Sequence, residues 1–146
     1  MKTSLISLIA HIKSKASDNP GVKGAELSLD PATERDLGVL WITPTAINTT
    51  GPTSTAGYTV NLTMFSMVRR AGDELFNISN ANQTMNDVLN GVDGDEWHTT
   101  DTFSWEPVSN GDGDRGLQVT LTIEPTAAVE WLQASEDCET QDLINE

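Results

Sequence analysis

The sequence is poor in cysteine and histidine, and each shortage excludes a kind of site. Cys138 is the single cysteine among 146 residues, so the chain can form neither an internal disulfide nor a zinc site built from several cysteines. His11 and His98 are the only histidines, and neither has a neighbour at the spacing of a metal ligand or a catalytic partner. No apolar run approaches the length that spans a bilayer.

Positive charge is also scarce. Eight Lys and Arg residues stand against 22 Asp and Glu residues, which gives a formal net charge of −14. Such a surface repels the phosphates of nucleic acids and of anionic membranes. We therefore expect no membrane binding and no attraction to DNA, although acidic side chains would also suit a surface that DNA has to slide past.

Recognisable motifs of catalysis are missing as well. The chain has no glycine-rich phosphate loop and no serine in a nucleophile elbow. Pairs of acids such as Asp93 with Asp95 arise easily in so acidic a sequence and carry little information. We predict no catalytic, cofactor-binding or metal-binding residues, no cofactor, and a function other than that of an enzyme.

One glycine-rich acidic stretch, Asn110-Gly-Asp-Gly-Asp114, could be either a calcium loop or the bend of a hairpin. A helix-flanked calcium loop that began at Asn110 would need glycine at its sixth position and glutamate at its twelfth. Arg115 and Leu121 occupy those positions, and alternating runs typical of strands flank the loop. The sequence therefore predicts a hairpin connection over 109–116, with Gly and Asn supplying positive φ, and leaves open only a weak adventitious cation.

Apolar periodicity predicts the order of the elements. Leu5, Leu8, Ile9 and Ile12 form one stripe of a helix, and the segment 117–123 alternates apolar and polar residues as a strand does. In chain order we expect a helix over 3–16, strands over 22–29 and 37–42, a polar Thr-rich loop over 45–57, a strand over 58–68, a helix from a cap at Asn77 or Ser79 to Gly91, an alternating segment over 97–107, and the final strand.

This order predicts an α+β fold. We expect a mostly antiparallel sheet of about four to five strands, with two helices packed on one face. Residues 1–125 form a single domain in this interpretation, and residues 126–146 form an acidic C-terminal extension or arm.

The tryptophans allow two interpretations. Trp97 and Trp105 share strand parity with Phe103, which favours core packing over an exposed face that stacks sugars or peptides. Trp131 lies in an otherwise polar tail, so either it folds back onto the sheet or it anchors the arm on a neighbouring subunit.

The order of elements resembles that of the tail-terminator and tail-completion proteins of tailed bacteriophages. The resemblance covers residues 3–125 and rests on four stretches: a strand ending near a proline, "LGVLWITPTAI" from Leu37; a long strand, "YTVNLTMFSMV" from Tyr58; the helical segment 86–90; and a closing hairpin, "FSWEPVSNGDGDRGLQVTLTIEP" from Phe103.

That resemblance implies a non-enzymatic virion protein of the tail or neck, made in the host cytoplasm. Its copies would form a ring, usually of six subunits, that caps the tail tube and joins it to the head connector. The implied partners are further copies of the chain, the tail tube protein and the connector or head-completion protein, while DNA passes only as cargo through an acidic lumen. A head-completion protein or a tube subunit belongs to the same class, and the sequence does not separate them.

Contacts in such a ring can be assigned as hypotheses. Three kinds of residue suit contacts with a subunit or partner: the scarce arginines at strand ends, the threonines of the polar loop and the tryptophan of the tail. These residues are Arg69, Arg70, Arg115, Trp131, Thr49, Thr50 and Thr53. The alternative functions are a small carbohydrate- or peptide-binding module that uses exposed tryptophans and, less favoured, an enzyme that uses acids and a divalent ion.

Overall fold

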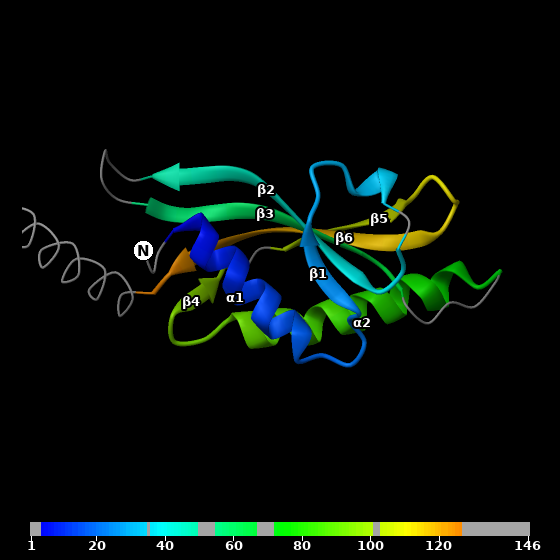
Figure 1. Ribbon diagram of the computed structural model, residues 1–146, viewed down its shortest axis with the longest axis horizontal. Coiled ribbons are helices and arrows are strands. Elements are labelled where there is room, and N and C mark those ends of the chain that lie inside the picture. Colours follow the sequence, from blue (N-terminus) through cyan, green and yellow to red (C-terminus); the bar gives the residue numbers. More distant parts are fainter. Residues whose placement is uncertain (1–3, 35, 50–54, 67–71, 101–102, 127–146) are drawn as a thin grey trace, which may run out of the picture.

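The computed structural model describes residues 4–34, 36–49, 55–66, 72–100 and 103–126. Two α-helices and a mixed sheet make up these residues, which confirms the α+β class (Figure 1). The sheet has six strands, in the order β1–β2–β3–β6–β4, with β5 also paired to β6. One more strand than predicted appears because the segment 97–107 forms two strands.

The first helix, α1 (Leu5–Ser17), matches its prediction closely. Ser4 caps it by accepting a hydrogen bond from the amide of Ser7, and Leu8, Ile9, Ile12 and Ala16 are buried. His11 lies beside this buried stripe, and its Nε2 is 2.9 Å from the carbonyl oxygen of Val92 at the end of the second helix. The imidazole thus ties the two helices together.

The second helix, α2 (Glu74–Val92), begins earlier than predicted. Asp73 is its N-cap and accepts a hydrogen bond from the amide of Phe76, so the predicted cap at Asn77 or Ser79 is wrong. The prediction failed because it placed the start of the helix by the apolar stripe from Ala81 onward, and the helix has additional residues before that stripe. Gly91 does not end the helix either, because Val92 continues the buried stripe.

Three long strands form the centre of the sheet. The antiparallel trio is β2 (Val39–Thr49), β3 (Thr55–Phe65) and β6 (Arg115–Pro125), and the short β1 (Gly24–Leu27) runs parallel to β2. A single-turn 3₁₀ helix (Pro31–Thr33) connects β1 to β2. The main core lies between this sheet and the helices, and its largest fully buried side chains include Leu8, Ile12, Leu40, Ile42, Leu62, Met64, Met85, Trp97, Leu121 and Ile123.

The prediction of a loop over 45–57 is wrong at both ends. β2 continues to Thr49 and β3 starts at Thr55, so that only residues 50–54 between them lie outside the described part of the chain. Threonine is polar, but its β-branched side chain favours extended backbone, and the cross-strand ladder from Pro44 to Thr49 holds the segment in the sheet.

The segment after α2 divides into β4 (Trp97–Thr99) and β5 (Ser104–Ser109), both paired to the same edge of β6. Thr99 pairs with Ile123, and Ser104 pairs with Thr120. The chain thus advances five residues from β4 to β5 while the partner positions on β6 move by three. The connection therefore holds two residues more than a continuous strand would need. Because two is an even number, Trp97 and Trp105 stay on the same face, as the predicted parity required.

The acidic glycine-rich stretch is the turn of the β5–β6 hairpin, as predicted. Oδ1 of Asn110 accepts hydrogen bonds from the amides of Asp112 and Asp114, at 3.0 Å each. Gly113 supplies the positive φ of the turn, at 78°. The expectation of positive φ at Asn110 is wrong, because this residue contributes its side chain to the turn instead.

Candidate functional site

Two surfaces stand out, and the first is the sheet face opposite the helices. Over 58–64 of β3 and 117–123 of β6, every second residue points into the core, and the intervening side chains are polar. Six of them pair across the two strands, and we call this set the polar face: Thr59, Asn61, Thr63, Gln118, Thr120 and Thr122.

The polar face is a ladder of three hydrogen-bonded rungs. Thr59 and Thr122 bring their hydroxyls to 3.1 Å. The hydroxyl of Thr120 donates to Oδ1 of Asn61 at 2.7 Å, and that of Thr63 donates to Oε1 of Gln118 at 3.1 Å. Thr63 is buried, while the other five side chains are half-buried. Hydrogen bonds therefore hold all six side chains in place, and five of the six still reach the surface.

No member of the polar face carries a charge at any ordinary pH. The nearest acids with the same strand parity are Glu106, opposite Gln118 on β5, and Glu124, two residues after Thr122. In a chain with a net charge of −14, the centre of this face is a neutral strip between acidic margins.

A second, smaller apolar cluster closes one end of the same sheet face. Val39, Trp41 and Phe65 are buried there, with Leu37 and Val108 packed against them. Nε1 of Trp41 has no hydrogen-bond partner among the described residues. The 3₁₀ helix docks on the neighbouring hairpin, since the amide of Gly111 donates to the carbonyl of Ala32 at 3.2 Å.

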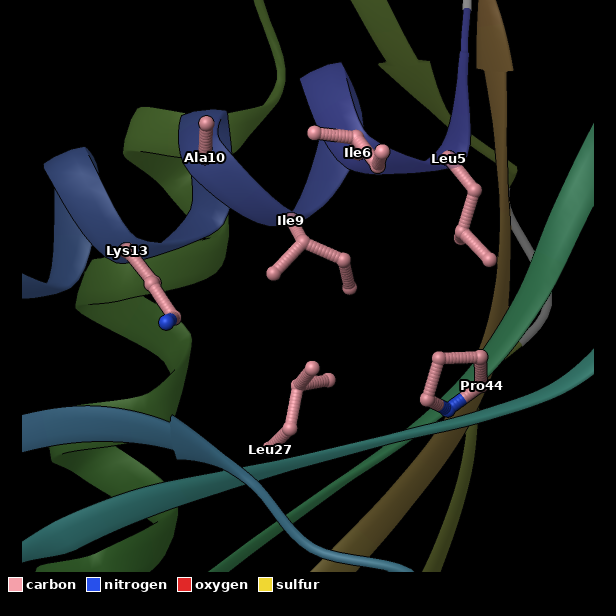
Figure 2. Close-up of a pocket in the computed structure, with 7 residues that line it drawn as sticks. All are labelled: Leu5, Ile6, Ile9, Ala10, Lys13, Leu27 and Pro44. Atoms are coloured by element: carbon pink, nitrogen blue, oxygen red, sulfur yellow. The ribbon is translucent and has the colours of Figure 1, made fainter.

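The second surface is an apolar groove between α1 and the edge of the sheet (Figure 2). Its volume is about 310 Å³. We call this set of lining residues the α1 groove: Leu5, Ile6, Ile9, Ala10, Lys13, Leu27 and Pro44. Ile6 is 83% exposed and Leu27 is 55% exposed, which is unusual for such large apolar side chains.

A further hollow adjoins the α1 groove and enlarges the apolar area. It shares Leu27 and Pro44 with the groove and adds Leu29, which is 92% exposed. Sequence reasoning missed this surface. The signal was present, because Ile6 lies off the stripe that α1 buries and the alternation of β1 places Leu27 and Leu29 on one side.

The local backbone explains why the α1 groove stays open. β1 ends at Leu27, while β2 runs on to Thr49, so the outer edge of β2 beyond Thr43 has no strand beside it among the described residues. The carbonyl of Ile42 faces that edge and accepts a hydrogen bond from the amide of Ser28 at 3.1 Å. Two residues on, Pro44 faces the same edge without an N–H group, so pairing with a further strand is interrupted there.

The predicted contact residues fall in different parts of the chain. Arg115, at the start of β6, lies near the first turn of α2, with its Nε 3.6 Å from Oε2 of Glu74. Thr49 is the last residue of β2. The other five predicted contacts lie outside the described residues: Arg69, Arg70, Thr50, Thr53 and Trp131.

The described tryptophans lie mostly in the interior. Trp97 is 1% exposed and contacts Tyr58 at a ring-centroid distance of 6.2 Å, and Trp105 is half-buried against the main core. Core packing was the favoured interpretation for both residues. Trp97 therefore offers no indole face for stacking a ligand.

The described ranges hold neither a cluster of metal ligands nor a helix that could span a membrane. No group of three or more His, Cys, Asp or Glu side chains there could hold a metal ion. The closest approach of a histidine and an acid is between His98 and Asp93, exposed residues whose Nδ1 and Oδ1 are 3.1 Å apart. Neither described helix is long and apolar enough to span a membrane.

The fold and its surfaces thus define an α+β domain with a neutral polar sheet face and an apolar groove. Comparison with family models gave no match, and no curated protein matched the sequence.

Proposed function

We propose that this chain is a non-enzymatic structural protein of a tailed-phage virion. In this proposal it is a tail terminator whose copies form a ring, and the ring caps the tail tube and joins it to the head connector. Its partners are further copies of itself, the tail tube protein and the connector or head-completion protein. DNA passes through the ring as cargo. The layout of residues 3–125 supports the family, and the polar face supports the assembly role.

The polar face is the observation that carries the proposal. Copies of a molecule with a net charge of −14 repel one another, so contacts between copies form most easily where the surface has no acid. The three central rungs between β3 and β6 meet this condition. Their position away from both helices leaves the face available to a neighbouring subunit.

The chemistry of the rungs suits a contact between subunits. Each threonine hydroxyl can donate one hydrogen bond and accept others, so the rungs can bond across an interface without losing their internal pairing. Interfaces of this kind are polar and hold bridging water, and their specificity comes from the placement of donors and acceptors. In a ring the polar face would meet a different surface of the next copy, since head-to-tail contacts are not self-complementary.

Replacement of one neutral rung residue by an acid tests the proposal. Asn61→Asp keeps the oxygen that accepts from Thr120 and adds one negative charge to the centre of the polar face. We expect the full chain to form a ring in solution, and we expect this variant to weaken each contact between subunits by about 10-fold or more. Sedimentation and electron microscopy would measure the mass and the shape of the particles.

Asn86→Asp is the matched control, because it makes the same change on the exposed side of α2. It should leave the assembly intact. Equal weakening by both variants would mean that net charge matters and the polar face does not. A full chain that stays monomeric, both alone and with tail tube protein, would contradict the proposal.

A further inference from the structure

We propose that the α1 groove binds the C-terminal segment of the same chain, with Trp131 as the residue that enters it. The proposal concerns a single molecule and does not rest on ring formation. Its evidence is the apolar lining of the groove, the charges around the groove, and the position at which the described chain ends.

The groove requires an apolar occupant that is not a strand. Its lining is apolar apart from Lys13, and Ile6 and Leu27 remain largely exposed in the described structure. Covering such side chains removes apolar area from water and is favourable. Pro44 interrupts hydrogen bonding along this edge of the sheet, so the occupant contributes side chains, not a further strand.

Charge complementarity identifies the occupant. The first 17 residues contain Lys2, Lys13 and Lys15 and no acid, which makes this stretch positive within a strongly negative chain. The last 20 residues contain no Lys or Arg and six acids: Glu130, Glu136, Asp137, Glu139, Asp142 and Glu146. Within the acidic tail, Val129, Trp131 and Leu132 form an apolar group that matches the groove.

The chain can span the required distance. β6 ends at the same end of the molecule as the start of α1 (Figure 1). Pro44 lies across the ladder from Val60, which lies across from Leu121. With strands ~4.8 Å apart and ~3.3 Å per residue along β6, Pro125 is about 16 Å from Pro44. The six residues from Pro125 to Trp131 can span about 20 Å.

Attachment to the same chain favours this occupant over a separate molecule. A segment on a short tether is present at its site at an effective concentration of order millimolar, far above that of a second copy in dilute solution. Lys13 is the one charged residue of the lining, and its Nζ lies 3.9 Å from Oε2 of Glu26, a pair that is largely exposed to solvent. The same ammonium group is available to an acid of the tail, such as Glu130.

The single cysteine provides the test. A nitroxide attached to Cys138 in the full chain broadens the NMR signals of methyl groups that it approaches. We expect the strongest broadening at the methyl groups of Ile6, Ile9 and Leu27, and little at Leu75, which is 79% exposed at the start of α2. Equal broadening at Leu75 and in the groove would overturn the proposal.

Matched variants separate a specific contact from a general one. Trp131→Ser and Leu27→Lys should each abolish the broadening in the groove, while Leu143→Ser in the tail and Leu75→Lys on α2 should leave it unchanged. Persistence of the broadening in Trp131→Ser would overturn the role of that residue. A mixture of nitroxide-labelled chain and isotope-labelled chain tests whether the tail binds the groove of its own molecule. Broadening in this mixture would show that the tail of a second copy occupies the groove, and it would overturn binding within one chain.

Discussion

Asn110 turns its side chain back over the β5–β6 connection and accepts hydrogen bonds from two backbone amides of that connection. Its Nδ2 also lies 3.4 Å from Oδ2 of Asp114. The residue is only 7% exposed, so these bonds are shielded from water. One amide side chain therefore accounts for a turn whose acids and glycines, taken by composition alone, resemble a calcium loop.

Asn110→Ala should destabilise the protein. It removes the acceptor for the amides of Asp112 and Asp114, and at about 1 kcal/mol for each hydrogen bond we expect a loss of about 2 kcal/mol in the free energy of unfolding. Urea unfolding followed by circular dichroism measures it. Ser109→Ala, an exposed neighbour, should change the free energy by less than about 0.5 kcal/mol. Equal effects from the two variants would show that the side chain of Asn110 does not hold the turn.

For single residues, the sequence predicted the kind of turn and the burial of a tryptophan better than it predicted the residue at which a helix begins. The hairpin over 109–116 was predicted correctly, because alternating runs flank the loop and because Arg115 and Leu121 stand where a calcium loop would need glycine and glutamate. The cap of α2 was misplaced, since Asp73 precedes the apolar stripe by several residues and composition does not distinguish it from the other polar candidates. Burial of Trp97 followed from strand parity, which depends only on counting.

Among the elements, β3 and β6 leave no room for a side chain at Gly116, which pairs with Phe65. A Cβ atom at this position would lie 2.7 Å from Cδ1 of Phe65 and would also overlap the carbonyl of Met64. Neither neighbour can move easily, because one is backbone and the other is a fully buried ring. The absence of a side chain here thus allows β6 to pair along its full length.

Gly116→Ala should therefore lower the free energy of unfolding by about 2–3 kcal/mol, through overpacking between the strands. Gly24→Ala is the matched control, because it also lies in a strand but has no atom within 4 Å of the added Cβ. It should be neutral or stabilising by about 0.5 kcal/mol, since alanine restricts the unfolded chain. Thermal unfolding of both variants would test this difference, and a neutral Gly116→Ala would refute the close approach.

Sequence predicted the elements with strong periodicity and missed those defined by their neighbours. α1 and the alternating β6 appeared at nearly their observed positions because apolar spacing dictates which face is buried. The extension of β2 to Thr49 depends on pairing with β3, and the split between β4 and β5 depends on the register of β6. The α1 groove exists only where α1 meets the sheet edge, so the apolar residues of α1 and of β1 indicate it only when the two segments are considered together.

For the whole molecule, the dominant quantity is the net charge of −14. Folding concentrates these charges and makes them repel, and salt screens the repulsion, with a Debye length that falls from ~10 Å at 0.1 M to ~3 Å at 1 M. We expect an increase in NaCl from 0.1 M to 1 M to raise the Tm by about 3 °C. For a chain of this size, that shift corresponds to a gain of roughly 1 kcal/mol in the free energy of unfolding. Calorimetry across a salt series would measure it.

The control is the same series near pH 4.2, where the net charge calculated from the sequence is zero. Long-range repulsion is absent there, so the salt effect should largely disappear. A Tm that is independent of salt at neutral pH would mean that the acids are arranged with little mutual repulsion. Equal salt effects at both pH values would identify a general effect of salt on burial of apolar groups.

The central place of β6 also constrains the order in which the molecule can take shape as it is made. This strand supplies Leu117, Val119, Leu121 and Ile123 to the core and pairs with three other strands, yet it is the last described element along the chain. Everything translated before it therefore lacks half of the backbone partners of β3. A nascent polypeptide that has not yet reached residue 115 can form helices and a β2–β3 hairpin, but it has no closed interior, so the native state becomes accessible only after β6 has left the ribosome.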